Sequence, residues 1–434
     1  MTNSFKIHVD WEAGDTGSPE ERCTHASLRI VAGGSVFTHV EDRFAKTTRE
    51  VIRVSAYPAA LWLASNWWRL TAEPDGPKAD PLSHRLGAAG MGFLWPDLHI
   101  VTDGKNVLLS ASSTRAPYDQ PIAYLGSPQA SIPSSTFTAG IEEFIERVSI
   151  RLVDSGLQDN DLARVWRLVR EERRDPTTAL FRRFEAILGF DPEEGATERI
   201  EPFVDASTRL GQEATMELAA GLKSVSDLQE LESALMASRQ TGRWQREDLL
   251  AHVTPAIDDS APPWKRGEIS AREARRAIGT PRGPITDYRL LDWLSLSKDL
   301  FKEENHDPPP CAVALRDDAD GTTIRLLLRN ARRLGRRFEL SRLVCDHLLA
   351  GPEDKILPAT MAKTARQQAQ RAFAAEFLLP HEDLAERFRN IPWDEEFAED
   401  TAKEFGVSPL MVQTCLVNKG LLDRHVYDAL AQKI

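Results

Sequence analysis

The stretch RRFELSRLVCDHLLAG, residues 336–351, decides how the C-terminal third of this 434-residue chain is interpreted. It predicts a helix, and on a helix Arg342 and Asp346 are neighbours on one face because they are four positions apart. We expect these two side chains to form an ion pair. Cys345 and His347 are only two positions apart, so they point in widely different directions.

Three flanking segments extend the pattern. WKRGEISAREARRAIGTPRGPITDYRLLDWL, residues 264–294, predicts a helix followed by a turn, and TTIRLLLR, residues 322–329, predicts a strand. QQAQRAFAAEFLLP, residues 367–380, predicts a second long helix that ends at Pro380 because proline does not continue a helix. The order of helix, strand, helix and helix indicates an α+β domain over residues 261–434.

Residues 264–294, 336–349 and 367–380 together resemble the ImmA/IrrE family of metallopeptidase-like proteins. Residues 336–349 fit the frame of that family's R-F-x-L-A-H-E-L-G-H-L-L helix at Arg337, Phe338, Leu340 and Leu349. Residues 373–380 fit its later F-A-A-x-L-L-M-P helix, and this is the most specific part of the match. The resemblance implies a zincin-like fold for the C-terminal domain.

The resemblance also implies which positions would carry catalysis. Two histidines four residues apart bind zinc in such peptidases, and a glutamate next to the first acts as general base. The first histidine position is Arg342, the glutamate position is Leu343 and the second histidine position is Asp346. The glutamate ligand of the later helix falls on Gln368, or on Gln367 if the register shifts by one.

The substituted residues predict a degenerate site with no catalytic residue, metal or cofactor. Of the replacements only Asp346 is a good zinc ligand, and a leucine accepts no proton. An alternative is that other side chains rebuild a metal or nucleophile site, with the candidates Cys345, Asp346, His347 and His381. If the protein is an enzyme, which these substitutions disfavour, it is a peptidase with non-standard ligands.

Working members of the family resemble stress and mobile-element regulators that cut a repressor. A member without its ligands is expected to be an inactive regulatory or sensor protein that binds a protein, peptide or small ligand. Its expected setting is stress response, mobile-element control or phage defence.

A DNA-binding regulator is the second alternative. Residues 398–422 predict a helix-turn-helix-like element, with a turn through Gly406 and with Ser408 and Pro409 as cap and first helical residue. The candidate nucleic-acid contacts are polar or basic, and they are Arg329, Arg332, Arg333, Arg336, Arg337, Gln413, Thr414, Asn418 and Lys419. The other interpretation of the arginine cluster is a solvated face paired with carboxylates.

The first 260 residues resemble no family that we name. Residues 1–137 predict a mixed α/β domain, in which Asp103-Gly104 marks a hairpin and PAALWLASNWWRL, residues 58–70, predicts a buried helix. We expect Trp62, Trp67 and Trp68 to pack in a core; a recognition surface is the alternative. Residues 138–260 predict a helical middle region whose helix after Asp175 ends at Gly189, and DDSAPP, residues 258–263, predicts the boundary to the last domain.

Composition limits the function classes further. The net charge of −12 argues against a surface that binds nucleic acid throughout, although local basic patches remain possible. The four cysteines are scattered, which favours free thiols, and no apolar run is long enough for a membrane span. We expect a cytoplasmic protein with no membrane partner.

Overall fold

The computed structural model has a mixed α+β fold that divides into two compact units. The N-terminal unit comprises Met1–Val204 with Ala362–Thr364, and the C-terminal unit comprises Asp205–Met361 with Ala365–Ile434. The structure describes residues 4–114, 120–250, 261–302, 307–317, 322–391 and 393–423.

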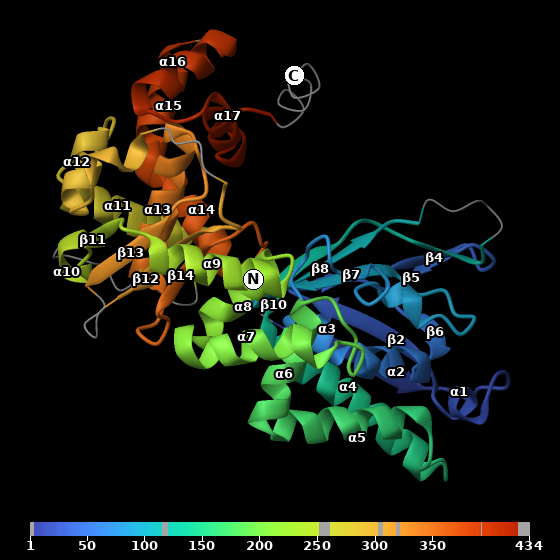
Figure 1. Ribbon diagram of the computed structural model, residues 1–434. Helices are drawn as coiled ribbons and strands as arrows, with labels where there is room; N and C mark the ends of the chain where they lie inside the picture. The colour runs from blue at the N-terminus through green and yellow to red at the C-terminus, as the bar shows by residue number, and fades with distance from the viewer. Residues whose placement is uncertain are drawn as a thin grey trace. The chain divides into compact units, whose positions relative to one another are not determined.

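Antiparallel strands build three small sheets in the N-terminal unit (Figure 1). The strands of the first sheet are β1 (Phe5–Trp11), β2 (His25–Ala32), β3 (Ser35–Val36) and β6 (Ile52–Ser55). Those of the second are β7 (Asp97–Thr102), β8 (Asn106–Ser112) and β10 (Gln129–Pro133). Those of the third are β4 (Val40–Asp42), β5 (Thr47–Arg49) and β9 (Ile122–Tyr124).

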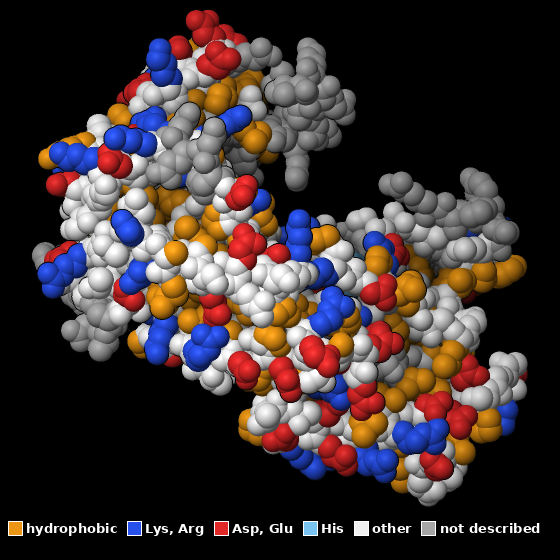
Figure 2. All heavy atoms as spheres, viewed as in Figure 1, with side chains coloured by type: hydrophobic (Ala, Val, Ile, Leu, Met, Phe, Trp, Pro, Cys, Tyr) orange, Lys and Arg blue, Asp and Glu red, His pale blue; other side chains and the backbone are white. Residues whose placement is uncertain are grey.

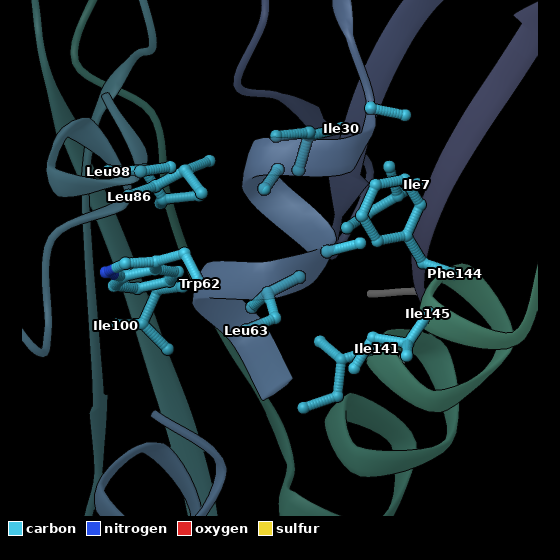
Figure 3. Close-up of a cluster of buried hydrophobic side chains, with 14 of the residues drawn as sticks. Ile7, Ile30, Trp62, Leu63, Leu86, Leu98, Ile100, Ile141, Phe144 and Ile145 are labelled. Carbon is cyan, nitrogen blue, oxygen red and sulfur yellow. The ribbon is translucent and has the colours of Figure 1, made fainter. Parts of the chain in front are cut away.

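Helices complete this unit. They are α1 (Pro19–Cys23), α2 (Tyr57–Ser65), α3 (Trp67–Ala72), the 3-10 helix η1 (Leu86–Ala89), α4 (Ser134–Asp154), α5 (Asp161–Arg174) and α6 (Pro176–Ile187), with α7 (Thr197–Leu210) crossing into the second unit. Helix α2 is buried between strands and α4: Figure 3 shows Trp62 beside Ile100, and Leu63 on the side of Ile141. An apolar sequence on all sides of α2 is what this central position requires.

The predicted hairpin and the predicted burial of the tryptophans are confirmed, but residues 58–70 form two helices, α2 and α3, which meet at Asn66, and not one. Strands β7 and β8 pair through the Asp103-Gly104 turn, and Gly104 has a φ of +90°, which favours glycine. Trp62, Trp67 and Trp68 are 8%, 2% and 4% exposed, so they belong to the core and do not form a recognition surface.

An antiparallel sheet of order β11-β13-β12-β14 forms the centre of the C-terminal unit (Figure 1). Its strands are β11 (Thr241–Arg243), β12 (Ala312–Arg316), β13 (Thr323–Leu327) and β14 (Ile356–Ala359). Its helices are α8 (Gln212–Gly221), α9 (Val225–Ala237), α10 (Arg246–Leu249), α11 (Pro263–Ala277), α12 (Asp287–Trp293), the 3-10 helix η2 (Lys298–Phe301), α13 (Arg333–Leu349), α14 (Ala365–Leu378), α15 (His381–Asn390), α16 (Glu395–Phe405) and α17 (Pro409–Asn418).

The middle region, expected over residues 138–260, is divided between the two units at residues 204 and 205. Helices α4 to α6 pack in the N-terminal unit, whereas α8 packs on β14 and α9 on β13. The region also contains strand β11, which the helical pattern did not predict; its three residues pair with β13 across about 80 positions of sequence. Half of the expected boundary, residues 258–260, lies outside the described residues, and α11 begins at its last residue, Pro263.

Candidate functional site

Helix α13 contains most of the stretch 336–351, and it is buried on most of its surface. Leu340, Leu343, Val344 and Leu348 are at most 1% exposed and pack in the core of the C-terminal unit. The helix contacts α14, β12 and β14, so its polar residues at 342 and 346 also lie inside the protein. A charged side chain at either position needs a partner there.

Arg342 has its hydrogen-bond partners on α14 and directly after β14. Its Nη2 donates to the carbonyl oxygen of Thr360 at 2.5 Å and to Oε1 of Gln367 at 2.5 Å. The side chain is 5% exposed, and burial lowers the pKa of Arg342 to about 10, with the charge of Arg371 acting in the same direction. The guanidinium is therefore charged at neutral pH and is fixed between β14 and α14.

Gln367 connects three parts of the unit. Its Oε1 also accepts from the backbone N of Thr360 at 3.0 Å, while its Nε2 donates to Glu217 of α8 and to the carbonyl oxygen of Pro358, each at 3.0 Å. Gln368, the next residue along α14, is half-buried. The structure therefore selects Gln367 over Gln368 as the residue of α14 that faces Arg342. Glu217 was missed by sequence analysis because it lies about 150 positions away.

The expected ion pair between Arg342 and Asp346 is wrong. Asp346 pairs instead with Arg366, whose Nε and Nη2 donate to its two oxygens at 2.7 and 2.8 Å. Arg366 also donates to Asp354 at 2.6 Å. Burial acts to lower the pKa of Arg366, but the two carboxylates more than offset it and raise that pKa. A bidentate ion pair with a residue of another helix is stronger than an ion pair with a neighbour four positions along the same helix.

The candidates for a rebuilt metal or nucleophile site do not come together. Cys345 is fully buried, and burial raises the pKa of its thiol well above the usual value. His347 packs edge-on against Trp244 at 5.7 Å between ring centroids, and His381 begins α15. Among the described residues, no group of three or more His, Cys, Asp or Glu side chains has a geometry that would hold a metal ion.

The buried His347 makes the stability of the C-terminal unit sensitive to acid. Burial, with the charge of Arg316, lowers the pKa of His347 to about 4, whereas a histidine in the unfolded chain titrates near ~6.5. Between these values the unfolded state binds a proton that the folded state does not, so stability is lost as pH falls from about 6.5 to about 4. The total loss is about 3 kcal/mol.

Urea unfolding between pH 7.5 and 4 checks this expectation. His347→Gln should flatten the slope in that window, while His8→Gln, at an exposed position, should leave it unchanged. An equal slope in both variants would mean that other groups control the acid sensitivity.

The arginine cluster is mostly structural, which corrects part of the predicted nucleic-acid contacts. Arg336 and Arg337 are 4% and 1% exposed and donate to backbone carbonyl groups, so they are not accessible to phosphate. Arg333 pairs with Asp287. Arg329 and Arg332 remain exposed. Figure 2 shows Lys and Arg side chains interspersed with Asp and Glu over the visible face.

Helices α16 and α17 form the terminal element. Gly406 ends α16 in the left-handed conformation, and the side chain of Ser408 caps α17 by accepting from the backbone N of Met411 at 3.2 Å. Thr414 and Asn418 are exposed and Gln413 is half-buried, but Lys419 donates to Glu268 of α11. Lys419, the basic candidate that caps the C-terminus of α17, is thus already bound to a carboxylate of the same unit.

In the C-terminal unit, α13 packs on β12 and β14 of the antiparallel sheet, and α14 packs on α13 and α11 (Figure 1). Residues 337–416 match the model of the Peptidase_M78 family, the IrrE N-terminal-like domain. This match confirms the resemblance of the C-terminal part of the chain to ImmA/IrrE proteins. The comparisons with curated proteins and with solved structures found no match. No helix among the described residues has the length and apolar character needed to cross a membrane.

Proposed function

We propose that this protein is a non-catalytic relative of the metallopeptidases that acts as a regulator or sensor by binding a protein or peptide partner. The observation that carries the proposal is the position of Arg342. Its guanidinium links β14 to Gln367 at the two positions where the resemblance implies a zinc ligand on each of two helices.

The charges of the site support loss of zinc chemistry. A fixed guanidinium repels a divalent cation, and Leu343 is buried without any group that accepts a proton. Asp346 retains a carboxylate, but both of its oxygens are bound to Arg366. The site therefore lacks the ligands and the base that hydrolysis by this mechanism needs.

Regulation is the proposed role because other polar residues stand where the resemblance implies catalytic residues, and they form a hydrogen-bonded network there. The hydrogen bonds of Arg342, Gln367 and Glu217 keep α8, β14, α13 and α14 together. A scaffold maintained in this way is suited to presenting a binding surface. The resemblance to stress and mobile-element regulators supports a role in stress response, mobile-element control or phage defence.

Metal analysis tests the proposal. Protein purified without a histidine tag or added zinc should contain only background metal by mass spectrometry. A variant that restores the family pattern, with Arg342→His, Leu343→Glu, Asp346→His and Gln367→Glu, should approach one zinc per chain, because histidine and glutamate would then converge between α13 and α14.

Two controls make this test decisive. The double variant Arg342→His and Gln367→Glu keeps the Asp346 ion pair and should bind zinc more weakly than the fourfold variant. Near-stoichiometric zinc in the unmodified protein, with chelator-sensitive cleavage of a protein substrate, would contradict the proposal and support a peptidase with non-standard ligands.

A further inference from the structure

Helices α11, α14, α15 and α17 of the C-terminal unit line a cavity of about 310 Å³. Its lining contains neither Arg342 nor Asp346, so it is separate from the positions at which the resemblance implies zinc ligands. Cavities that bind small molecules commonly measure about 300–1,000 Å³. This cavity is therefore large enough for a small organic molecule.

Most of the lining is apolar. Ala372 and Ala375 of α14 have no side-chain atoms beyond Cβ, so they leave space that larger residues would fill. Leu379 and Leu384 continue this apolar surface, and the indole of Trp264 adds to it with 53% of its surface exposed. Covering these side chains with hydrocarbon removes apolar surface from water, so the lining favours a ligand with an apolar body.

The carboxylates and the ammonium group of the lining already have ionic partners within the unit. Nε of Arg272 donates to Glu376 at 2.8 Å. Glu268 pairs with Lys419. Lys265 and Arg272 lie at 4.0 and 3.9 Å from the carboxylate of Glu268. The cavity therefore presents no unmatched charge, and an ionic ligand would lose its hydration there without gaining a counterion.

Two polar side chains of the lining have no ionic partner and no hydrogen bond among the described residues. They are the imidazole of His381, whose Nδ1 is unpartnered, and the carboxamide of Asn418, which is exposed. His381 contributes only its backbone N, which donates to Glu376 at 3.3 Å. Burial raises the pKa of the Cys415 thiol to about 12, so this thiol adds no charge. An imidazole and a carboxamide each donate and accept hydrogen bonds, as a hydroxyl group does.

We propose that this cavity binds a small neutral ligand that has an apolar body and a hydroxyl group. The apolar body would lie on Ala372, Ala375 and the neighbouring leucines, and the hydroxyl group would form hydrogen bonds with His381 and Asn418. An amine or a carboxylate of the same size is disfavoured, because the charges of the lining are already paired. Since the lining joins α17 to α11 and α14, the bound ligand would also hold the terminal helix on the unit.

Calorimetric titration of the full chain with 2-phenylethanol tests the assignment, using phenethylamine and 3-phenylpropanoate as cationic and anionic probes of similar size. The alcohol should bind at least about tenfold more tightly than either ion, because an ion entering the cavity loses hydration and finds no free counterion. Ala375→Leu, which fills the cavity, should abolish binding, and Ala237→Leu at an exposed position of α9 should not.

Two further variants test the hydroxyl contact and the role of the paired charges. His381→Phe combined with Asn418→Leu removes the uncharged polar groups, so the preference for 2-phenylethanol over propylbenzene should disappear. Glu268→Gln leaves Lys419 without its carboxylate, so the affinity for 3-phenylpropanoate should rise about tenfold while that for the alcohol stays the same.

Methyl signals of Leu379 and Leu384 in nuclear magnetic resonance spectra locate the ligand without any substitution, and they should shift when 2-phenylethanol is added. No binding of the alcohol, tighter binding of the amine or the acid by the unmodified protein, or alcohol binding that Ala375→Leu leaves intact would each overturn the proposal.

Discussion

Arg366→Met is expected to lower the stability of the C-terminal unit by about 3–5 kcal/mol, because it leaves buried carboxylates without their counterion. Asp346 and Asp354 are each 2% exposed, and Arg366 is the ion-pair partner of both. Asp354 keeps one hydrogen bond, from the backbone N of Ala214 at 3.2 Å. Methionine fills a similar volume and supplies no positive charge.

The same ion-pair network predicts an order among variants. Asp346→Asn should cost less than Arg366→Met, since Arg366 then still pairs with Asp354. The double variant Asp346→Leu and Arg366→Met should lower the free energy of unfolding by less than the sum of the single variants Asp346→Leu and Arg366→Met. Removing both partners leaves only one carboxylate, that of Asp354, unpaired.

Hydrogen exchange of the α13 and α14 amides measures this stability within the unit. Arg164→Met is the matched control, because Arg164 pairs with Asp159 and Asp161 on an exposed helix of the other unit, and it should leave these amides unchanged. Equal protection of these amides from exchange in the unmodified protein and in the Arg366→Met variant would show that the ion pairs contribute no net stability.

Arg337→Lys is expected to cost about 3 kcal/mol, although the charge is kept, because two buried carbonyl groups would lose a donor. Arg337 donates to the carbonyl oxygens of Gly406 at 3.1 Å and Ile285 at 2.8 Å, and it pairs with Asp287. Burial lowers its pKa, but Asp287 opposes that effect. Lysine cannot reach three acceptors in this fork geometry.

Because Gly406 forms the turn between α16 and α17, the effect should extend to the terminal element. Amide exchange should accelerate in α17 as well as in α13. Arg332→Lys is the matched control: Arg332 belongs to the same arginine cluster but is exposed, so its exchange rates should not change. If α17 keeps its protection in Arg337→Lys, the terminal helices are held by their apolar contacts alone.

Local signals in the sequence predicted much of the secondary structure. Ser408 and Pro409 begin α17, Asp175 caps α6, and Asp103-Gly104 turns the β7–β8 hairpin. Each depends on residues within a few positions, where a cap or a positive φ has few solutions. The family resemblance likewise depends on side-chain order along two helices, and the match over residues 337–416 confirms it.

The long-range partners could not be predicted in this way. The pattern placed Arg342 beside Asp346 on one helix, but tertiary packing brings Arg366 to Asp346 and brings Gln367, with Glu217 beyond it, to Arg342. Strand β11 forms only because β13 provides an edge for it.

The sequence by itself therefore determined the long helices and one strand of the C-terminal domain, its family resemblance and the loss of the zinc-binding residue types. Only the tertiary structure decided which charges are buried and what neutralises them, including the burial of Arg336 and Arg337 in a cluster that looked like a phosphate-binding surface. The physical reason is that an ion pair depends on the distance between side chains in the folded chain, which their spacing along the sequence does not fix.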